Sequence, residues 1–304
     1  MKILPAILPA ILPVLLLCGC SKAVPFPHPD GNEALKHAKE LALIVPRHSG
    51  SEGAKLAAEQ IERKAKELSA FQVSADVFRA QTPAGNLTFR NVSAVLPGKS
   101  AKFIVVGAHY DAKKLDSVPN FQGANDGGSG VGALLAMMKA LQDAGTVPPL
   151  ELRFVFFDGE EARILYTDGD GFHGSQRYVS ELRRRNELRN CRAMILLDMV
   201  GDGDLKFALP PDTDPILAAT AMKAAHELGY GKNIQLNGPQ VLDDHTAFQN
   251  AGIPAIDLID FEYGPDNIYW HTAGDSVDKL SANSLGISAA IALKMVWKLT
   301  GMEP

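Results

Sequence analysis

The sequence predicts an α/β protein with one domain, in which a mixed, mostly parallel central sheet is flanked by helices on both faces. Three observations support this fold. Short apolar runs alternate with helical patterns over most of the chain, which is typical of buried parallel strands. Two half-exposed strands precede them and add an antiparallel part. The 304 residues show no internal repeat and no second block of different composition, so one domain is favoured over two.

The first part of the chain predicts two helices and a hairpin. Apolar residues recur at helical spacing in residues 31–44 and 51–70. Apolar and polar residues then alternate in residues 71–80 and 86–98, as in strands with one exposed face. Residues 83–85, Pro-Ala-Gly, supply a turn between these strands.

The rest of the chain alternates between strands and helices. Short apolar runs predict buried strands at residues 102–108, 150–158, 193–201, 204–209 and 253–260. Amphipathic or apolar segments between them predict helices at residues 127–145, 172–185, 214–228, 246–252 and 281–299. This order gives a sheet with helices packed on it.

The charge balance excludes nucleic acid as an expected partner. The formal net charge is -5, and no cluster of basic residues is large enough to form a phosphate-binding surface. The three arginines at 183–185 are interpreted as part of a solvated helix face.

The N-terminus has the layout of an export signal. Residues 1–19 are interpreted as a signal peptide, because an apolar stretch follows Lys2 and ends in Leu-Cys-Gly-Cys. This ending resembles a bacterial lipoprotein signal, which implies lipidation of Cys20 and a membrane-anchored protein in the periplasm or at the cell surface. Residues 20–31, with three prolines, then form a tether to a catalytic domain at 32–304. The alternatives are an ordinary cleaved signal and a short anchor.

If Cys18 is removed and Cys20 is lipidated, Cys191 is the last cysteine. No disulfide can then form within the mature chain. No histidine is placed by the sequence to activate Cys191, so an inert thiol is expected there.

Residues of metal-ligand type lie at or beyond the ends of separate apolar runs. Ligands bind parallel sheets in the crevice beyond the carboxyl ends of the strands, so one pocket is expected to collect these side chains. Carboxylates and imidazoles together suit a divalent ion, and zinc is the best match. The residues are His109, Asp126, Glu160, Glu161, Asp198 and His271.

Glu160 and Glu161 make the strongest local argument. Two adjacent carboxylates after an apolar strand are costly to bury unless a cation or a proton compensates them. If one binds a metal, its neighbour can keep a raised proton affinity and act as general acid and base. An exposed acidic turn is the less favoured alternative, because the preceding strand places this turn over the sheet.

Asp198 has an argument of its own, and Asp243, Asp244 and Trp270 are three further candidates. Asp198 ends an apolar strand and is difficult to explain as a solvated residue. Asp243 and Asp244 precede a short helix, so either could be catalytic or could simply cap that helix. Trp270 stands directly before His271 and can form the wall of a pocket.

Seven segments together resemble one superfamily: the zinc aminopeptidases related to secreted bacterial leucine aminopeptidases, with the glutaminyl cyclases that share their fold. The segments are AHYDA, GANDGGSG, FFDGEEA, HGSQRYV, LLDMVGD, DDHTAF and YWHT. The resemblance implies a mixed sheet between helices. It implies zinc on Asp126, Glu161 and His271, with Glu160 as the acid/base group. In the peptidase branch, a second zinc would bind His109 and Asp198 and share Asp126.

The sequence carries features of both branches. A longer loop at 163–172, Asp243-Asp244-His245 and Trp270 before His271 resemble the cyclases. The glycine-rich GANDGGSG segment and the presence of both His109 and Asp198 resemble the peptidases. The disulfide of animal cyclases and the tryptophan of their long loop are absent from this sequence.

The cyclase branch is favoured. The resemblance then implies a glutaminyl-peptide cyclotransferase that converts N-terminal glutamine of peptides or proteins to pyroglutamate and releases ammonia. One zinc ion is expected, with Asp198 and Asp243 in the proton network and Trp270 in the substrate pocket. The first alternative is an aminopeptidase with two zinc ions. The second is a non-catalytic surface lipoprotein that binds peptides.

Overall fold

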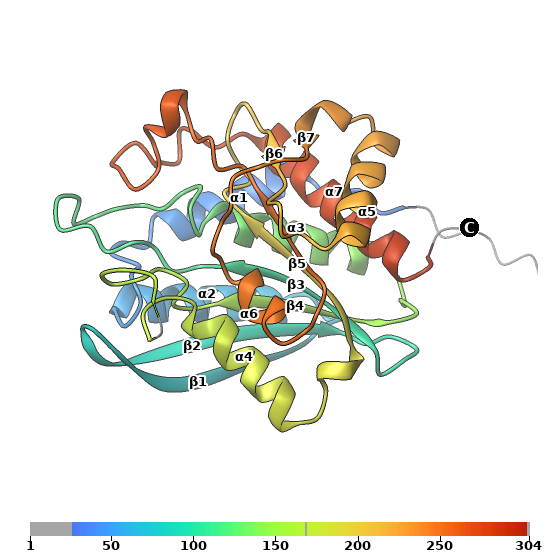
Figure 1. Cartoon of the computed structure of the whole chain (residues 1–304), viewed down its shortest axis with the longest axis horizontal. Coiled ribbons are helices and arrows are strands. Elements are labelled where there is room, and N and C mark those ends of the chain that lie inside the picture. Colours follow the sequence, from blue (N-terminus) through green and yellow to red (C-terminus); the bar gives the residue numbers. More distant parts are fainter. Residues whose placement is uncertain (1–25, 168, 303–304) are drawn as a thin grey trace, which may run out of the picture.

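The computed structural model describes residues 26–167 and 169–302. Its centre is a six-stranded sheet in the order β1-β2-β4-β3-β5-β8 (Figure 1). Within this sheet β4, β3, β5 and β8 are parallel to one another, and β2 is antiparallel to both of its neighbours. The strands are β1 (Gln72–Thr82), β2 (Gly85–Leu96), β3 (Phe103–His109), β4 (Glu151–Phe157), β5 (Cys191–Asp198) and β8 (Ala255–Ile259).

Helices cover both faces of the sheet, as predicted (Figure 1). One face packs against α1 (Gly31–Ala42), α2 (Glu52–Lys66), α3 (Ser129–Asp143), α5 (Pro215–Glu227) and α7 (Ala282–Leu299). The other packs against α4 (His173–Arg184) and α6 (His245–Gln249). Short 3-10 helices η1 (Leu188–Asn190), η2 (Gly231–Asn233) and η3 (Pro265–Asn267) lie in connections.

The central strands are buried on both faces, which explains their apolar sequences. Every residue of β3 is buried, and alternate residues belong to different cores. Ile104 packs in the core on the α3 side, and Phe103 in the core on the α4 side. The strand therefore has no solvent-facing side on which polar residues would be favoured.

The predicted hairpin forms with the expected turn. β1 and β2 pair in register from Gln72 opposite Val95 to Thr82 opposite Gly85. The side chain of Thr82 donates to the carbonyl of Gly85, and Gly85 has a positive φ of 99° that a residue without a Cβ adopts freely.

One predicted strand is largely wrong. Of residues 204–209, only β6 (Phe207–Ala208) is a strand, and it pairs with β7 (Ile234–Gln235) in a separate two-stranded sheet. Two prolines, at 210 and 211, follow β6 and remove the N–H groups that a longer strand needs. The local apolar pattern predicted an element there but could not show its pairing.

The helix expected at 51–70 is also shorter than predicted. It ends at Lys66, and the chain turns through bonds from Leu68 N–H to the Ala65 carbonyl and from Phe71 N–H to the Leu68 carbonyl. Leu68 and Phe71 remain buried against the core after the helix has ended. Because these two apolar residues are buried after the turn, the helical spacing of apolar residues continues past the end of the helix. The predicted helix was therefore too long.

The predicted signal peptide and Cys20 lie outside the described residues. Within the described part, the ring of Phe26 packs edge-on against Trp297 of α7, with centroids 5.7 Å apart. Cys191 is a buried free thiol, and burial raises its pKa to about 12, which agrees with the expected inert residue. No helix among residues 26–167 and 169–302 is long and apolar enough to cross a membrane.

A fully buried arginine connects α1 to the loops at the strand ends. The Arg47 guanidinium donates to the carbonyl of Tyr110 at 2.7 Å, to that of Gly123 at 2.8 Å and to that of Leu41 at 3.3 Å. Sequence periodicity gave no sign of it, because Arg47 lies in a loop.

Replacing Arg47 with Leu is expected to lower the free energy of unfolding by about 3 kcal/mol or more, since three buried carbonyl groups lose their donor. Urea denaturation followed by circular dichroism would measure the change. Arg63→Leu, on the exposed face of α2, is the control, with an expected change within about 0.5 kcal/mol. Equal effects of the two substitutions would contradict the importance of these bonds.

Candidate metal centre and active site

The predicted ligands converge at the carboxyl ends of neighbouring strands. His109 is the last residue of β3, and Asp198 is the last residue of β5. Glu160 and Glu161 follow β4, which pairs with β3. His271 comes from the loop after β8, beside β5. Parallel pairing of these strands therefore brings distant parts of the sequence to one edge.

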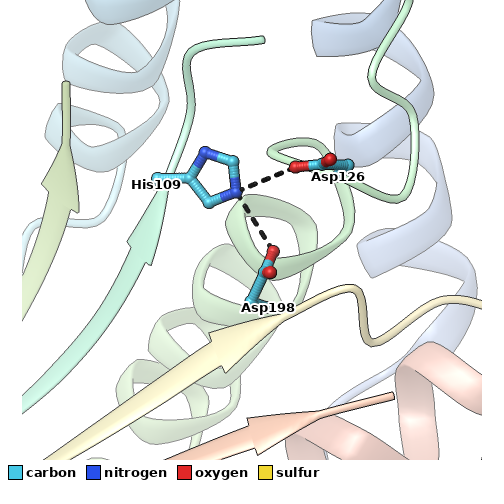
Figure 2. Close-up of side chains that lie close together, drawn as sticks. All are labelled: His109, Asp126 and Asp198. Carbon is cyan, nitrogen blue, oxygen red and sulfur yellow. Dashed lines mark hydrogen bonds and ion pairs between the residues drawn. The ribbon is translucent and has the colours of Figure 1, made fainter. Parts of the chain in front are cut away.

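Asp126 joins two clusters of possible metal ligands. Its Oδ1 lies 3.3 Å from Nε2 of His109, which lies 3.1 Å from Oδ1 of Asp198 (Figure 2). Its other oxygen, Oδ2, lies 3.2 Å from Nε2 of His271, which is also 3.2 Å from Oε1 of Glu161. In each cluster the three ligand atoms lie within 4.8 Å of one another. A carboxylate with one oxygen toward each cluster can bridge two ions or serve one.

Hydrogen bonds with two other segments hold the loop that carries Asp126. Its backbone N–H and that of Asn125 donate to the carboxylate of Asp275, at 3.2 and 2.8 Å. The Asn125 side chain accepts from Gly201 N–H at 2.8 Å, which ties the loop to the turn after Asp198. Gly127 follows with φ 89°, and a Cβ there would lie 2.3 Å from the carbonyl oxygen of Asp111. Only glycine fits this close approach.

Asp111 holds the turn that carries the two glutamates. Its Oδ1 accepts from the N–H groups of Gly159 and Glu160, and its Oδ2 accepts from that of Glu161. Its Oδ1 is also 3.7 Å from Nδ1 of His109, which is too long for a hydrogen bond. Its main structural contact is with the turn.

Two residues next to the clusters adopt a left-handed backbone. Met199, directly after Asp198, has φ 52°, and His271 also has φ 52°. Such conformations are unfavourable for residues with a Cβ and gather at functional sites. At both positions the strained backbone turns the chain at the ligand cluster.

The pKa shifts describe a site crowded with negative charge. Burial acts to raise the pKa of Asp126, but hydrogen bonds with His109 and His271 outweigh it and hold this pKa well below its ordinary value. Burial likewise acts to lower the pKa of His271, yet its bonds to Asp126 and Glu161 raise it to about 10. The clusters therefore stabilise positive charge at the places where the imidazoles lie.

The donor set fits a divalent cation. Each cluster offers one imidazole nitrogen and two carboxylate oxygens, a mixture that zinc accepts. Asp126, Glu161 and Asp198 are all less than a tenth exposed, and buried carboxylates at this density need compensation. Either two protonated histidines or bound metal can supply it.

Glu160 lines a cavity that borders both clusters, but it belongs to neither of them. The cavity has a volume of about 250 Å3 and is lined by residues of both clusters, together with Glu160, Asp243 and Trp270. Burial raises the pKa of Glu160 well above its ordinary value, and the carboxylates of Glu161 and Asp243 raise it further. A buried carboxyl group with a raised pKa suits proton transfer.

Asp243 and Asp244 are not explained as helix caps. Asp244 stands at the N-cap of α6, but its side chain makes no capping bond. Burial raises the pKa of Asp243 well above its ordinary value, with the carboxylate of Asp257 next in effect, and Asp198 contributes as well. Asp243 lines the cavity, whereas Asp244 is buried away from it.

The cavity wall contains one predicted aromatic residue. The indole of Trp270 stacks on the ring of His271, with centroids 4.1 Å apart, and also contacts Phe261. The stacking fixes the plane of the imidazole, while the indole presents apolar surface to the cavity. Trp270 therefore lines the cavity beside His271.

Sequence reasoning missed two polar groups that contact Glu161. The hydroxyl of Tyr166 donates to Oε2 of Glu161 at 2.9 Å and lies 3.4 Å from Oε2 of Glu160. Nζ of Lys113 is 3.2 Å from the same Glu161 oxygen. Tyr166 belongs to the long loop that the sequence had singled out, but nothing in its pattern showed that the loop folds over the glutamates.

The comparisons with known proteins agree with this geometry. Residues 91–296 match the sequence model of peptidase family M28. The chain belongs to this family. It is 31% identical over 261 residues to the bovine glutaminyl-peptide cyclotransferase-like protein, covering 77% of this chain and 67% of that protein.

Solved structures include both predicted branches. The crystal structure of a glutaminyl cyclase from an Acidobacteriales bacterium superposes with a TM-score of 0.84 at 30% identity, covering 97% of this chain and 100% of that one. A leucine aminopeptidase precursor from Bacteroides thetaiotaomicron superposes with a TM-score of 0.79 at 26% identity, covering 90% and 99%. Family M28 and its glutaminyl cyclase-like branch are thus where this chain belongs.

If the clusters bind metal, added zinc is expected to raise the melting temperature of chelator-treated protein by about 5 °C, because the ion binds only the folded state. Differential scanning calorimetry with and without zinc measures this shift. Asp126→Asn is expected to lose most of the shift, because both clusters share that residue. Asp116→Asn, at an exposed carboxylate, is the control and should keep the shift. An unchanged shift in Asp126→Asn would argue against these ligands.

Proposed function

We propose that this protein is a zinc-dependent glutaminyl-peptide cyclotransferase, which converts N-terminal glutamine of peptides to pyroglutamate and releases ammonia. The observation that carries the proposal is the position of Glu160. This buried carboxyl group, with its raised pKa, shares a small cavity with the Asp126, Glu161 and His271 cluster. The likeness to glutaminyl cyclases supports the choice of reaction.

Each cavity residue has a defined task in this reaction. Asp126, Glu161 and His271 would hold zinc, and the bound ion would supply Lewis-acid polarisation of the γ-amide carbonyl of the substrate. Glu160 takes a proton from the α-amine as its nitrogen attacks the γ-carbonyl carbon. It then gives the proton to the departing amide nitrogen, which leaves as ammonia.

The surrounding residues support this proton transfer. The carboxyl group of Asp243 raises the pKa of Glu160, and that of Asp198 raises the pKa of Asp243, so we assign both to the proton network around Glu160. Trp270 forms an apolar wall for the glutamine side chain. A cavity of this size limits the conformations of the reacting chain and favours a bent, ring-forming one.

Glu160→Gln is expected to lower kcat by about 100-fold or more, because the proton acceptor is lost, while zinc binding is kept. Coupled detection of ammonia from a Gln-peptide measures turnover, and metal analysis measures zinc. Glu67→Gln, an exposed residue after α2, is the control and should remain fully active. Full activity of the Glu160 variant would exclude Glu160 as the acid/base group.

A two-zinc aminopeptidase is the second candidate, and one observation favours it. The His109, Asp126 and Asp198 cluster is complete and shares Asp126 with the first cluster. In that reaction Glu160 would accept the proton of the attacking water.

Paired assays separate the two reactions. We expect about one zinc per chain and ammonia from a Gln-peptide, with no leucine from a Leu-peptide. Two zinc ions per chain with free leucine as product would favour the aminopeptidase. Inactivity of zinc-loaded protein on both substrates would favour the non-catalytic, peptide-binding alternative.

We also propose that the protein is an exported bacterial lipoprotein. Residues 1–19 would be the signal peptide, Cys20 would carry the lipid, and residues 20–31 would connect it to the catalytic domain at 32–304. Peptide and protein N-termini outside the cytoplasm would then be its substrates. Mass spectrometry of the membrane fraction tests this: a diacylated or triacylated N-terminal Cys20 is expected, and an unmodified form that starts elsewhere would exclude the anchor.

A further inference from the structure

A second cavity adjoins the candidate active site. It has a volume of about 450 Å3, and Tyr166 and Leu242 line both cavities. It lies between α4 and α6, two helices that pack side by side on one face of the sheet (Figure 1). We call it the α4–α6 groove.

Both helices lead away from the active site. α4 starts at His173, whose N–H bonds to the carbonyl of Gly159 in the glutamate turn. α6 starts at His245, two residues after Asp243. A chain that leaves the site between Tyr166 and Leu242 therefore enters a channel bounded by these two helices.

One face of each helix lines the α4–α6 groove. Gln176, Val179 and Arg183 come from α4, at positions that follow the helical repeat. Ala247 and Ala251 on the α6 side have small side chains that leave room for a ligand backbone. The groove thus has small side chains on its α6 side and long polar side chains on its α4 side.

The long polar groups in the groove have no partner among the residues that the structure describes. Arg184 and Arg185 form ion pairs with Glu181, but Arg183 pairs with no residue in the described part of the chain. The side-chain amides of Gln176 and Asn250 likewise make no hydrogen bond to described residues. These groups remain available to bind a ligand.

We propose that the α4–α6 groove binds the residues that follow the N-terminal residue of the substrate, and that Arg183 selects peptides with acidic residues there. This inference rests on the proposed function, which places the substrate N-terminus in the neighbouring cavity. The amides of Gln176 and Asn250 hydrogen bond to the extended peptide backbone, and the guanidinium pairs with a carboxylate.

The dimensions set the position of the acidic residue. From Phe172, at the site end of the groove, to Arg183 the helix rises about 16 Å. An extended chain advances about 3.3 Å per residue, so Arg183 is reached by roughly the fifth residue after the one in the active-site cavity. Peptides shorter than this do not contact Arg183.

Binding can be measured without turnover in the zinc-loaded Glu160→Gln protein. The probes are dye-labelled Gln-Ala-Ala-Ala-Asp-Asp-Ala-amide and its counterpart with lysines in place of the aspartates. Fluorescence anisotropy at low salt should give a Kd for the acidic peptide about fivefold lower than for the basic one. Adding Arg183→Glu should abolish or reverse this preference. Arg185→Glu, with the same change of net charge outside the groove, should keep it.

Unchanged selectivity in the Arg183→Glu protein, with an unaltered melting temperature, would overturn the proposal. Turnover separates this result from failure of the proposed function. Active protein should release ammonia from Gln-Ala-amide equally with and without Arg183→Glu, because the short substrate does not reach Arg183. If no Gln substrate is turned over, the cyclase proposal fails, while the anisotropy result still decides whether the groove selects acidic peptides.

Discussion

The site depends on the burial of many carboxylates at one edge of a parallel sheet. Asp126, Glu161 and Asp198 are ligand candidates, and Glu160 and Asp243 lie in the same cavity. So much negative charge in a buried place is unfavourable without positive charge. The two imidazoles, and metal where it binds, provide that charge, and the fold is arranged to bring them within reach of Asp126.

The surrounding hydrogen bonds show how the backbone maintains this arrangement. Asp275 and Asn125 fix the loop of Asp126, whereas Asp111 fixes the turn of Glu160 and Glu161. Arg47 hydrogen bonds to a carbonyl just after β3 and to a carbonyl in the loop before Asp126, and so connects the two segments. The support is polar and fully buried, so loss of a supporting group alters both stability and the geometry of the site.

Two neighbouring cavities correspond to the two parts of the proposed binding site. The smaller one is lined by Glu160 and is the proposed site of the reacting residue. The larger one, between α4 and α6, is lined by exposed polar residues and can hold the following part of a peptide. Tyr166 and Leu242 line both cavities, so these two residues mark the boundary between the proposed catalytic site and the proposed peptide-binding groove.

The sequence by itself determined the fold class and the residues at the strand ends, because apolar runs have a characteristic length and parallel strands end at a common edge. His109 and Asp198 could be predicted as candidate metal ligands from the sequence alone. The short pairing of β6, the contact of Tyr166 with Glu161 and the support from Arg47 came only from the tertiary structure. These contacts join loops across long sequence separations, and a local pattern carries no information about which distant loops meet.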